Sequence, residues 1–292
     1  MREVILADFI LEVLLDAGID TLKMIPFLFL AYLVIEYVEH HQSKRLEKAL
    51  TGQSKYGFLT GAALGVFPQC GFSAMAANLY ASKVITVGTL VAVFISTSDE
   101  AIPMLFAAPG QAGIMLKLVG LKVVFAAIAG FLIDFVLKKL IPIGLGGYEN
   151  SVSDCDCHEH NERDSVLLAA VKHTVHITLY IFLFSLVIGF VVEWIGMDTI
   201  KAFLSSIGPW QLLVAGIVGF IPNCAASIML TQLYIEGGLA FSAAVTGLCT
   251  GAGVGILVLF KQNRNWKENL CILALVYIFS VLAGLAVMML GM

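Results

Sequence analysis

Apolar residues gather in eight long segments separated by short polar stretches. Six of them have the usual length of a helix that crosses roughly 30 Å of hydrocarbon. A longer polar stretch, 140–164, divides the eight into two halves of similar pattern. This pattern predicts an all-α polytopic membrane protein. The segments are residues 19–39, 55–82, 84–108, 112–138, 165–193, 209–236, 238–260 and 268–290.

Two of the segments carry the same motif. Residues 65–80 read GVFPQCGFSAMAANLY and residues 219–234 read GFIPNCAASIMLTQLY, which align without a gap at an offset of 154 residues. The proline near the centre of each copy removes a backbone donor and interrupts a helix. Exposed backbone at membrane depth must be buried in protein or face water. Each segment is therefore either one broken helix or a re-entrant hairpin, and the duplication indicates a transporter built from two repeats.

The basic residues favour the hairpins, because Lys and Arg gather on the cytoplasmic side of a membrane. If both segments re-enter, eleven of the Lys and Arg residues outside the segments share one side, and only Arg2 and Lys201 lie opposite. If both segments cross, the basic residues divide between the two sides. The sequence thus predicts two inverted repeats, each with a re-entrant hairpin and a broken transmembrane helix, ten helices in all when hairpin arms are counted.

This topology divides the chain into four parts. Residues 1–18 form an amphipathic helix or the start of the first span, because acidic residues recur through them and exclude a signal peptide. Residues 19–139 are the first transmembrane repeat, 140–164 a cytoplasmic linker that contains Cys and His, and 165–292 the second repeat. The expected location is a prokaryotic inner membrane.

Composition agrees with a membrane protein. Of the 292 residues, 59% are hydrophobic and 13% charged, whereas soluble domains carry about 25% charged residues. The six cysteines form no disulfide framework in a chain without secretory features. The lipid bilayer is the expected partner and nucleic acid is not; a homo-oligomer is left open.

A second interruption follows each hairpin. Residues 96–100 read STSDE, and the corresponding residues 250–255 read TGAGVG. Discontinuous helices at equivalent places in two repeats point to a transporter's binding site. An acidic residue inside the membrane is a functional candidate, so Asp99 and Glu100 are expected to bind a metal or a coupling ion. The alternative is a helix N-cap at Asp99. The candidate residues are Ser96, Thr97, Ser98, Asp99, Glu100 and Thr250.

The hairpin tips supply further candidates. Cys70 and Cys224 each lie two positions after a proline, and a thiolate is a ligand for soft metals and trivalent metalloids. Gln69 and Asn223, next to them, supply amide groups to a polar ligand. The alternative is that both cysteines are small buried hydrophobes, as Cys249 and Cys271 are expected to be.

Two groups outside the hairpins could also bind metal. The linker contains four soft or borderline ligands within six residues, which suit a flexible chelating segment; a polar linker without such a role is the alternative. Two histidines three residues apart open the fifth segment, for a metal or proton role or as interfacial residues. These residues are Cys155, Cys157, His158 and His160 in the linker, and His173 and His176 in the segment.

The duplicated P-x-C motif, the intramembrane STSDE and the Cys/His linker resemble a known family. The chain is similar, over nearly its whole length, to the ten-helix heavy-metal exporters, also called arsenic efflux or manganese transporter proteins. The resemblance implies efflux of a metal or metalloid ion by a secondary mechanism.

The expected function is therefore a secondary-active transporter that works by alternating access around the two hairpin tips. No nucleotide-binding G-x-x-x-x-G-K-[ST] motif and no H-E-x-x-H metalloprotease motif is present in the sequence, so we expect no enzyme. A metal ion is the expected substrate, H⁺ or Na⁺ the coupling ion, and no cofactor is obligatory. The alternative is an ion-coupled transporter of a small organic solute or anion.

Overall fold

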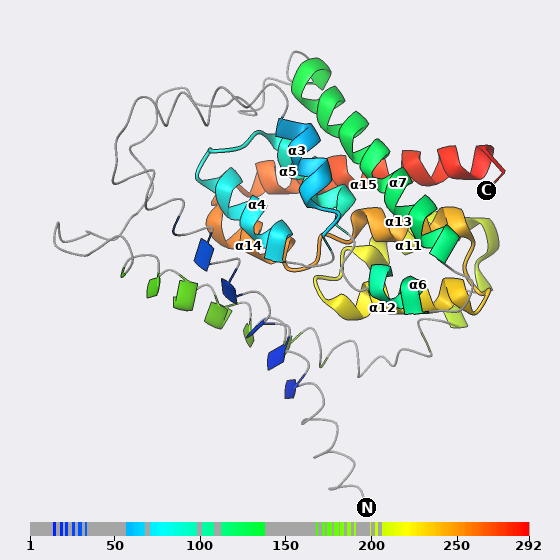
Figure 1. The fold of residues 1–292 in the computed structure, drawn as a ribbon, viewed down its shortest axis with the longest axis horizontal. Coiled ribbons are helices and arrows are strands. Elements are labelled where there is room, and N and C mark those ends of the chain that lie inside the picture. The colour runs from blue at the N-terminus through cyan, green and yellow to red at the C-terminus, as the bar shows by residue number, and fades with distance from the viewer. Residues whose placement is uncertain are drawn as a thin grey trace, which may run out of the picture.

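The computed structural model describes residues 57–67, 71–97, 101–107, 112–137 and 206–291, with isolated positions between 14 and 33 and between 168 and 203. Within these ranges the chain forms helices and no strand. Figure 1 shows them as one packed bundle. The helices are α3 (Gly57–Leu64), α4 (Gly71–Ala81), α5 (Val87–Ser96), α6 (Ala101–Ala107), α7 (Ala112–Leu132) with a π-helical end (Ile133–Leu137), a 3-10 turn (Gly208–Trp210), α11 (Gln211–Gly219), α12 (Cys224–Ile235), α13 (Phe241–Thr250), α14 (Gly255–Gln262) and α15 (Trp266–Met289).

All four predicted interruptions divide a helix. The segments 55–82 and 209–236 become the pairs α3 with α4 and α11 with α12. The segments 84–108 and 238–260 become α5 with α6 and α13 with α14. The segments without an interruption, 112–138 and 268–290, form the long helices α7 and α15. The predicted all-helical class and the predicted breaks are therefore confirmed.

Helices α5 and α13 lie at the centre of the bundle. All ten residues of α5 are buried, and so are nine of the ten residues of α13. Helices α3 and α7 pack against α5, and α11 and α15 pack against α13. A broken helix has backbone groups that lipid cannot satisfy, and the surrounding helices keep these groups away from lipid.

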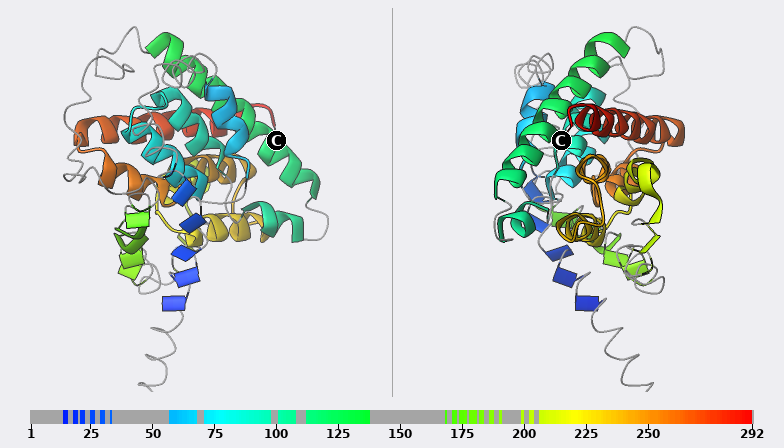
Figure 2. Two further views of the ribbon diagram at one scale, coloured as in Figure 1. Left: turned by 60° about the vertical axis from the view of Figure 1, so that its left-hand side comes forward. Right: turned by 90° about the vertical axis from the view of Figure 1, so that its right-hand side faces the viewer.

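The long outer helices carry the surface expected to face lipid. Residues 113–137 (α7 and its π-helical end) and 266–289 (α15) are long and apolar enough to span a membrane. The stretch 241–262 is also long and apolar enough, but it contains the buried helix α13 and does not form this surface. Figure 2 shows α7 running along one side of the molecule, and its exposed side chains include Leu116, Val124 and Phe131. Apolar side chains exposed along a long helix are typical of lipid contact, so the chain is an integral membrane protein.

The two halves repeat the same close helix contacts. A Cβ atom on Gly130 of α7 would lie 2.8 Å from the carbonyl oxygen of Gly88 in α5. A Cβ atom on Gly284 of α15 would lie 2.8 Å from the carbonyl oxygen of Ser242 in α13. Both residues of the second pair lie 154 positions after those of the first. Residues that are equivalent in the sequence repeat therefore make equivalent contacts in the structure.

Two helix pairs join the halves. Helix α4 of the first half packs against α14 of the second, and α12 of the second packs against α6 of the first; Figure 1 shows each pair side by side. At the offset of 154, α4 corresponds to α12 and α6 to α14. The contact between α4 and α14 therefore has a counterpart in the contact between α12 and α6.

A carboxylate holds the start of α5. Asp134, in the π-helical end of α7, accepts a hydrogen bond from the Gly88 amide (3.0 Å) and one from the Thr86 hydroxyl (2.7 Å). Thr86 itself caps the helix by accepting from the Thr89 amide (3.1 Å). A negative charge near a helix N-terminus is favourable. The counterpart of Asp134 at the offset of 154 is Met288, so this anchor belongs to the first half alone.

We expect Gly219→Ala to destabilise the fold, because its methyl group would overlap the Gly247 carbonyl and the Thr250 hydroxyl. Overpacking of this kind costs about 1–3 kcal/mol. The matched control is Gly120→Ala on α7, where a Cβ atom meets nothing within 4 Å and alanine is the better helix former. Thermal unfolding in detergent checks both, and equal melting temperatures for the two variants would contradict the repeat packing.

Candidate substrate and ion site

The first break begins where α5 ends. The chain leaves the helix at Thr97, whose backbone is extended (φ −55°, ψ 127°). The Ser96 hydroxyl donates to the carbonyl of Ala92 (2.8 Å), and the Thr97 hydroxyl donates to that of Val93 (2.7 Å). Both residues are buried. Their protons therefore satisfy backbone carbonyls, which leaves oxygen lone pairs as the groups that a cation can use.

The second break also follows the end of a central helix, but it contains fewer polar side chains than the first. The hydroxyl of Thr250, the last residue of α13, donates to the carbonyl of Gly247 (2.9 Å). Gly253 has a positive φ of 52°, which favours glycine. The chain turns through this residue and re-enters a helix at Gly255. The second break thus exposes backbone where the sequence of the first has acidic and hydroxyl side chains.

The ends of α3 and α11 each pack against the break of their own half. A side chain at Gly65, which follows α3, would overlap the Ser96 hydroxyl. A side chain at Gly219, which ends α11, would overlap the Thr250 hydroxyl. The two pairs are equivalent at the offset of 154. Each glycine allows the end of the arm to approach the break closely.

Helix α4 of the first half reaches the break of the second half. A Cβ atom on Gly255, the first residue of α14, would lie 2.7 Å from the Cβ atom of Ser73 in the first turn of α4. The equivalent helices α12 and α6 also pack together. The described helix ends on either side of the two proline motifs therefore lie next to the two breaks.

A buried lysine joins the two broken helices at the centre of the bundle. Lys122 of α7 is 1% exposed, and its Nζ atom donates to the carbonyl oxygens of Thr97 and of Leu248, the latter at 2.6 Å. The last carbonyls of a helix lack partners within the helix and carry its negative dipole end. The ammonium group therefore satisfies the C-terminal ends of α5 and α13 together.

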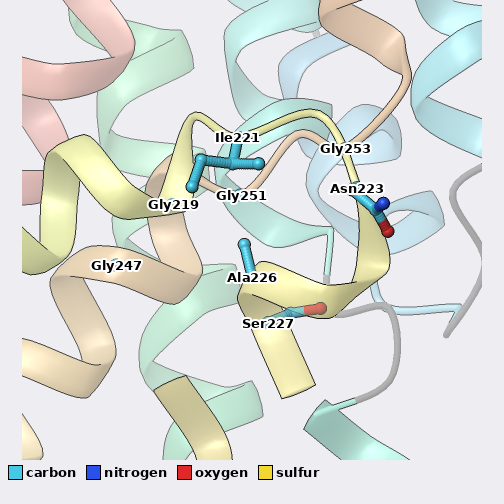
Figure 3. Close-up of a pocket in the computed structure, with 8 residues that line it drawn as sticks. All are labelled: Gly219, Ile221, Asn223, Ala226, Ser227, Gly247, Gly251 and Gly253. Carbon is cyan, nitrogen blue, oxygen red and sulfur yellow. The ribbon is translucent and has the colours of Figure 1, made fainter. Parts of the chain in front are cut away.

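Figure 3 shows a small hollow beside the second hairpin tip, between the turn that follows Gly219 and the second break. The hollow is large enough for about one molecule the size of water. The Asn223 side-chain oxygen accepts from the Ala225 amide (3.1 Å) and so caps α12, and its NH₂ group remains a possible donor to a ligand. The lining residues are Gly219, Ile221, Asn223, Ala226, Ser227, Gly247, Gly251 and Gly253.

The structure places five of the predicted site residues. Asn223 lines the hollow, while Ser96, Thr97 and Thr250 are buried beside the breaks. His176 is exposed. Cys224 begins α12, but its side chain lies outside the described part of the chain, together with Gln69, Cys70, Ser98, Asp99, Glu100, Cys155, Cys157, His158, His160 and His173. Within the described ranges, no three His, Cys, Asp or Glu residues are grouped as metal ligands.

The sequence reasoning missed Lys122. It counted basic residues in loops and left out those inside apolar segments, although a charge within a span is itself a functional signal. It also missed Asp134, near the end of the same segment. By contrast, Cys249 is fully buried in the core and Cys271 packs against it, as expected for cysteines with a packing role.

Comparison with known proteins gives one finding. A protein-family model described as "Putative, 10TM heavy-metal exporter" matches residues 6–163, 142–253 and 208–291. The matches cover both halves and the linker between them. No curated protein and no solved structure matches the chain.

We expect Asn223→Ala to loosen the second hairpin tip, because α12 loses its cap, at a cost of about 1 kcal/mol. Hydrogen exchange of a peptide that covers residues 223–227 should become faster. Asn223→Ser is the matched control, since serine also caps a helix and should keep the exchange slow. Equal exchange in the two variants would mean that the side-chain cap does not hold the tip.

Proposed function

The chain belongs to the ten-helix heavy-metal exporter family, and from this premise we propose that it exports a metal or metalloid ion by alternating access around two opposed hairpin tips. The observation that carries the proposal is the convergence of the described hairpin ends and both helix breaks. Binding sites between discontinuous helices near the membrane centre are typical of secondary transporters. The substrate would lie between residues 68–71 and 222–225 and contact both breaks.

The lengths of the hairpin arms support re-entrant segments. Helices α3 and α11 have eight and nine residues, and α4 and α12 have eleven and twelve. At 1.5 Å per residue, each is well short of the roughly 30 Å of hydrocarbon. Each arm would therefore run from one membrane face to a tip near the midplane.

A contact between distant segments supports the inverted arrangement. The Tyr80 hydroxyl, at the end of α4, donates to the Glu268 carboxylate, at the start of α15. Lys83 and Lys267 therefore belong to loops at the same end of the bundle. Crossing segments would put those loops on opposite membrane faces, whereas re-entrant hairpins put them on the same face. A two-fold axis in the membrane plane would then relate the repeats.

The basic end of the bundle would face the cytoplasm of a prokaryotic cell. The linker 140–164, with its Cys and His residues, would lie on that side and capture metal for export. A proton or sodium gradient would drive transport, because the sequence has no nucleotide-binding motif. Protonation of Asp99 would release a bound cation, since the proton and the cation compete for one carboxylate.

One observation favours a second substrate class. The N-terminus of α12 borders the hollow, and the Lys122 ammonium lies at the centre. Both provide positive charge, which suits an anion or the carboxylate of a small organic solute. Competition separates the two classes: a metal ion should inhibit uptake of a second metal ion, but should not inhibit transport of an organic anion.

We expect Asp99→Asn to slow the transport of arsenite and Mn²⁺ in proteoliposomes by at least about tenfold, because the intramembrane negative charge is lost. Glu236→Gln, at an exposed acid that follows α12, is the matched control and should transport normally. Asp99→Ser tests the helix-cap alternative, since serine caps without charge. Normal transport by either Asp99 variant would remove the carboxylate from the mechanism.

We expect the double variant Cys70→Ser, Cys224→Ser to lose resistance to soft ions, because a hydroxyl replaces the thiolate ligand at both tips. Cells with the wild-type or the variant protein would be grown on a panel of arsenite, antimonite, Cd²⁺, Zn²⁺ and Mn²⁺. Cys271→Ser, on α15, is the control with one altered thiol outside the tips. Arsenite resistance retained in the double variant would argue for a harder cation bound by Asp99.

A further inference from the structure

The bonds of Lys122 cross the boundary between the two repeats. The side chain starts on α7, and one acceptor, Thr97, follows α5 of the same half. The other acceptor, Leu248, belongs to α13 of the second half. One nitrogen atom therefore holds a carbonyl oxygen from each broken helix, and the ends of those helices lie within the hydrogen-bonding reach of a single group.

The counterpart of Lys122 is apolar. The equivalent position, 154 residues later, is Val276 on α15, which is fully buried. Valine thus satisfies the packing of this position in one repeat. Burial of an ammonium group is costly unless its partners compensate. Packing alone therefore does not account for lysine in the other repeat.

The carbonyl oxygens at the ends of discontinuous helices are typical ligands of coupling cations in transporters. Their partial negative charge and their fixed positions suit Na⁺, K⁺ or ammonium. The Nζ atom of Lys122 lies where such a cation would lie, at hydrogen-bonding distance from two of these oxygens.

We propose that Lys122 is a tethered cation: its ammonium group occupies a monovalent-cation site formed by the carbonyl ends of α5 and α13, and thereby positions both helix breaks. The core then needs no free Na⁺ or K⁺ to keep these ends together. A coupling ion, if it is a free cation, binds at another place. This role of Lys122 does not depend on which substrate is exported.

Lys122→Ala should empty the monovalent-cation site, so that a free cation can bind there in place of the lysine ammonium group. The substitution deletes the Cγ, Cδ, Cε and Nζ atoms, which n-propylammonium replaces with the same shape and charge. In detergent, the melting temperature of the variant should fall by roughly 5–10 °C. Millimolar n-propylammonium should recover most of this loss, and NH₄⁺ or K⁺ a part of it, while the wild-type protein should not respond.

Two controls separate charge from shape. n-Propanol fills the same space without a charge and should not restore stability. Lys117→Ala removes a lysine from the exposed side of the same helix and should neither lower the melting temperature nor create a response to n-propylammonium. Equal recovery by n-propanol, or no response of Lys122→Ala to any cation, would overturn the proposal.

Lys122→Met keeps most of the side chain, one atom shorter than lysine, but lacks its charge. It should melt below the wild type, should not respond to n-propylammonium because the space is filled, and should transport arsenite and Mn²⁺ at least roughly tenfold more slowly. A Met variant as stable and as active as the wild type would overturn the proposal. Transport by Lys122→Ala should also be measured with and without n-propylammonium, so that one folded variant serves as its own control. Recovery of transport would support the tethered cation. If n-propylammonium restores the melting temperature but not transport, the positioning role of Lys122 is overturned.

Discussion

Inside a membrane every backbone N–H and C=O group needs a partner from the protein, because lipid supplies none, and each failure costs several kcal/mol. A helix that stops midway leaves a set of such groups at its end. In this molecule the ends of α5 and α13 meet that need with polar groups of the chain itself. The Thr250 hydroxyl donates to a carbonyl in the last turn of α13, and Lys122 donates to one carbonyl at each end.

These hydrogen bonds require the helix backbones to approach one another closely, and glycine residues make this approach possible. Apolar helices in lipid have little hydrophobic reason to associate, so small residues that let backbones touch become important. Gly65 and Gly219 bring the ends of α3 and α11 against the breaks, while Gly130 and Gly284 bring the long outer helices against the central ones. These four contacts hold the surrounding helices against α5 and α13, so the packing of the bundle and the protection of its polar centre depend on the same residues.

The sequence predicted the helical class, the four interruptions and their pairing, because Pro68, Pro222 and the glycines at 251–255 act on the backbone locally. It could not predict the partner of each broken end. Lys122 lies 25 residues from Thr97 and 126 from Leu248, and no periodic pattern links positions so far apart. The exchange of α4 and α12 between the halves is likewise a tertiary fact. Of the predicted site residues, Asn223 borders a hollow, whereas the hydroxyls of Ser96, Thr97 and Thr250 are engaged by their own helices. The roles of the acidic pair and of the tip cysteines stay predictions, since their side chains lie outside the described residues.

The repeats share a scaffold but not a chemistry. Lys122, Thr97 and Asp134 in the first half correspond to Val276, Gly251 and Met288 in the second. The first half thus supplies the charged and hydroxyl groups that fix its broken helix at both ends, by Asp134 at the start and by Lys122 at the finish. The second half supplies glycine, a positive φ at Gly253 and the hollow beside it. In the proposed transporter, a ligand held between two such halves would meet side-chain charge on one side and backbone groups on the other, and the unequal repeats would distinguish the two ends of a bound group.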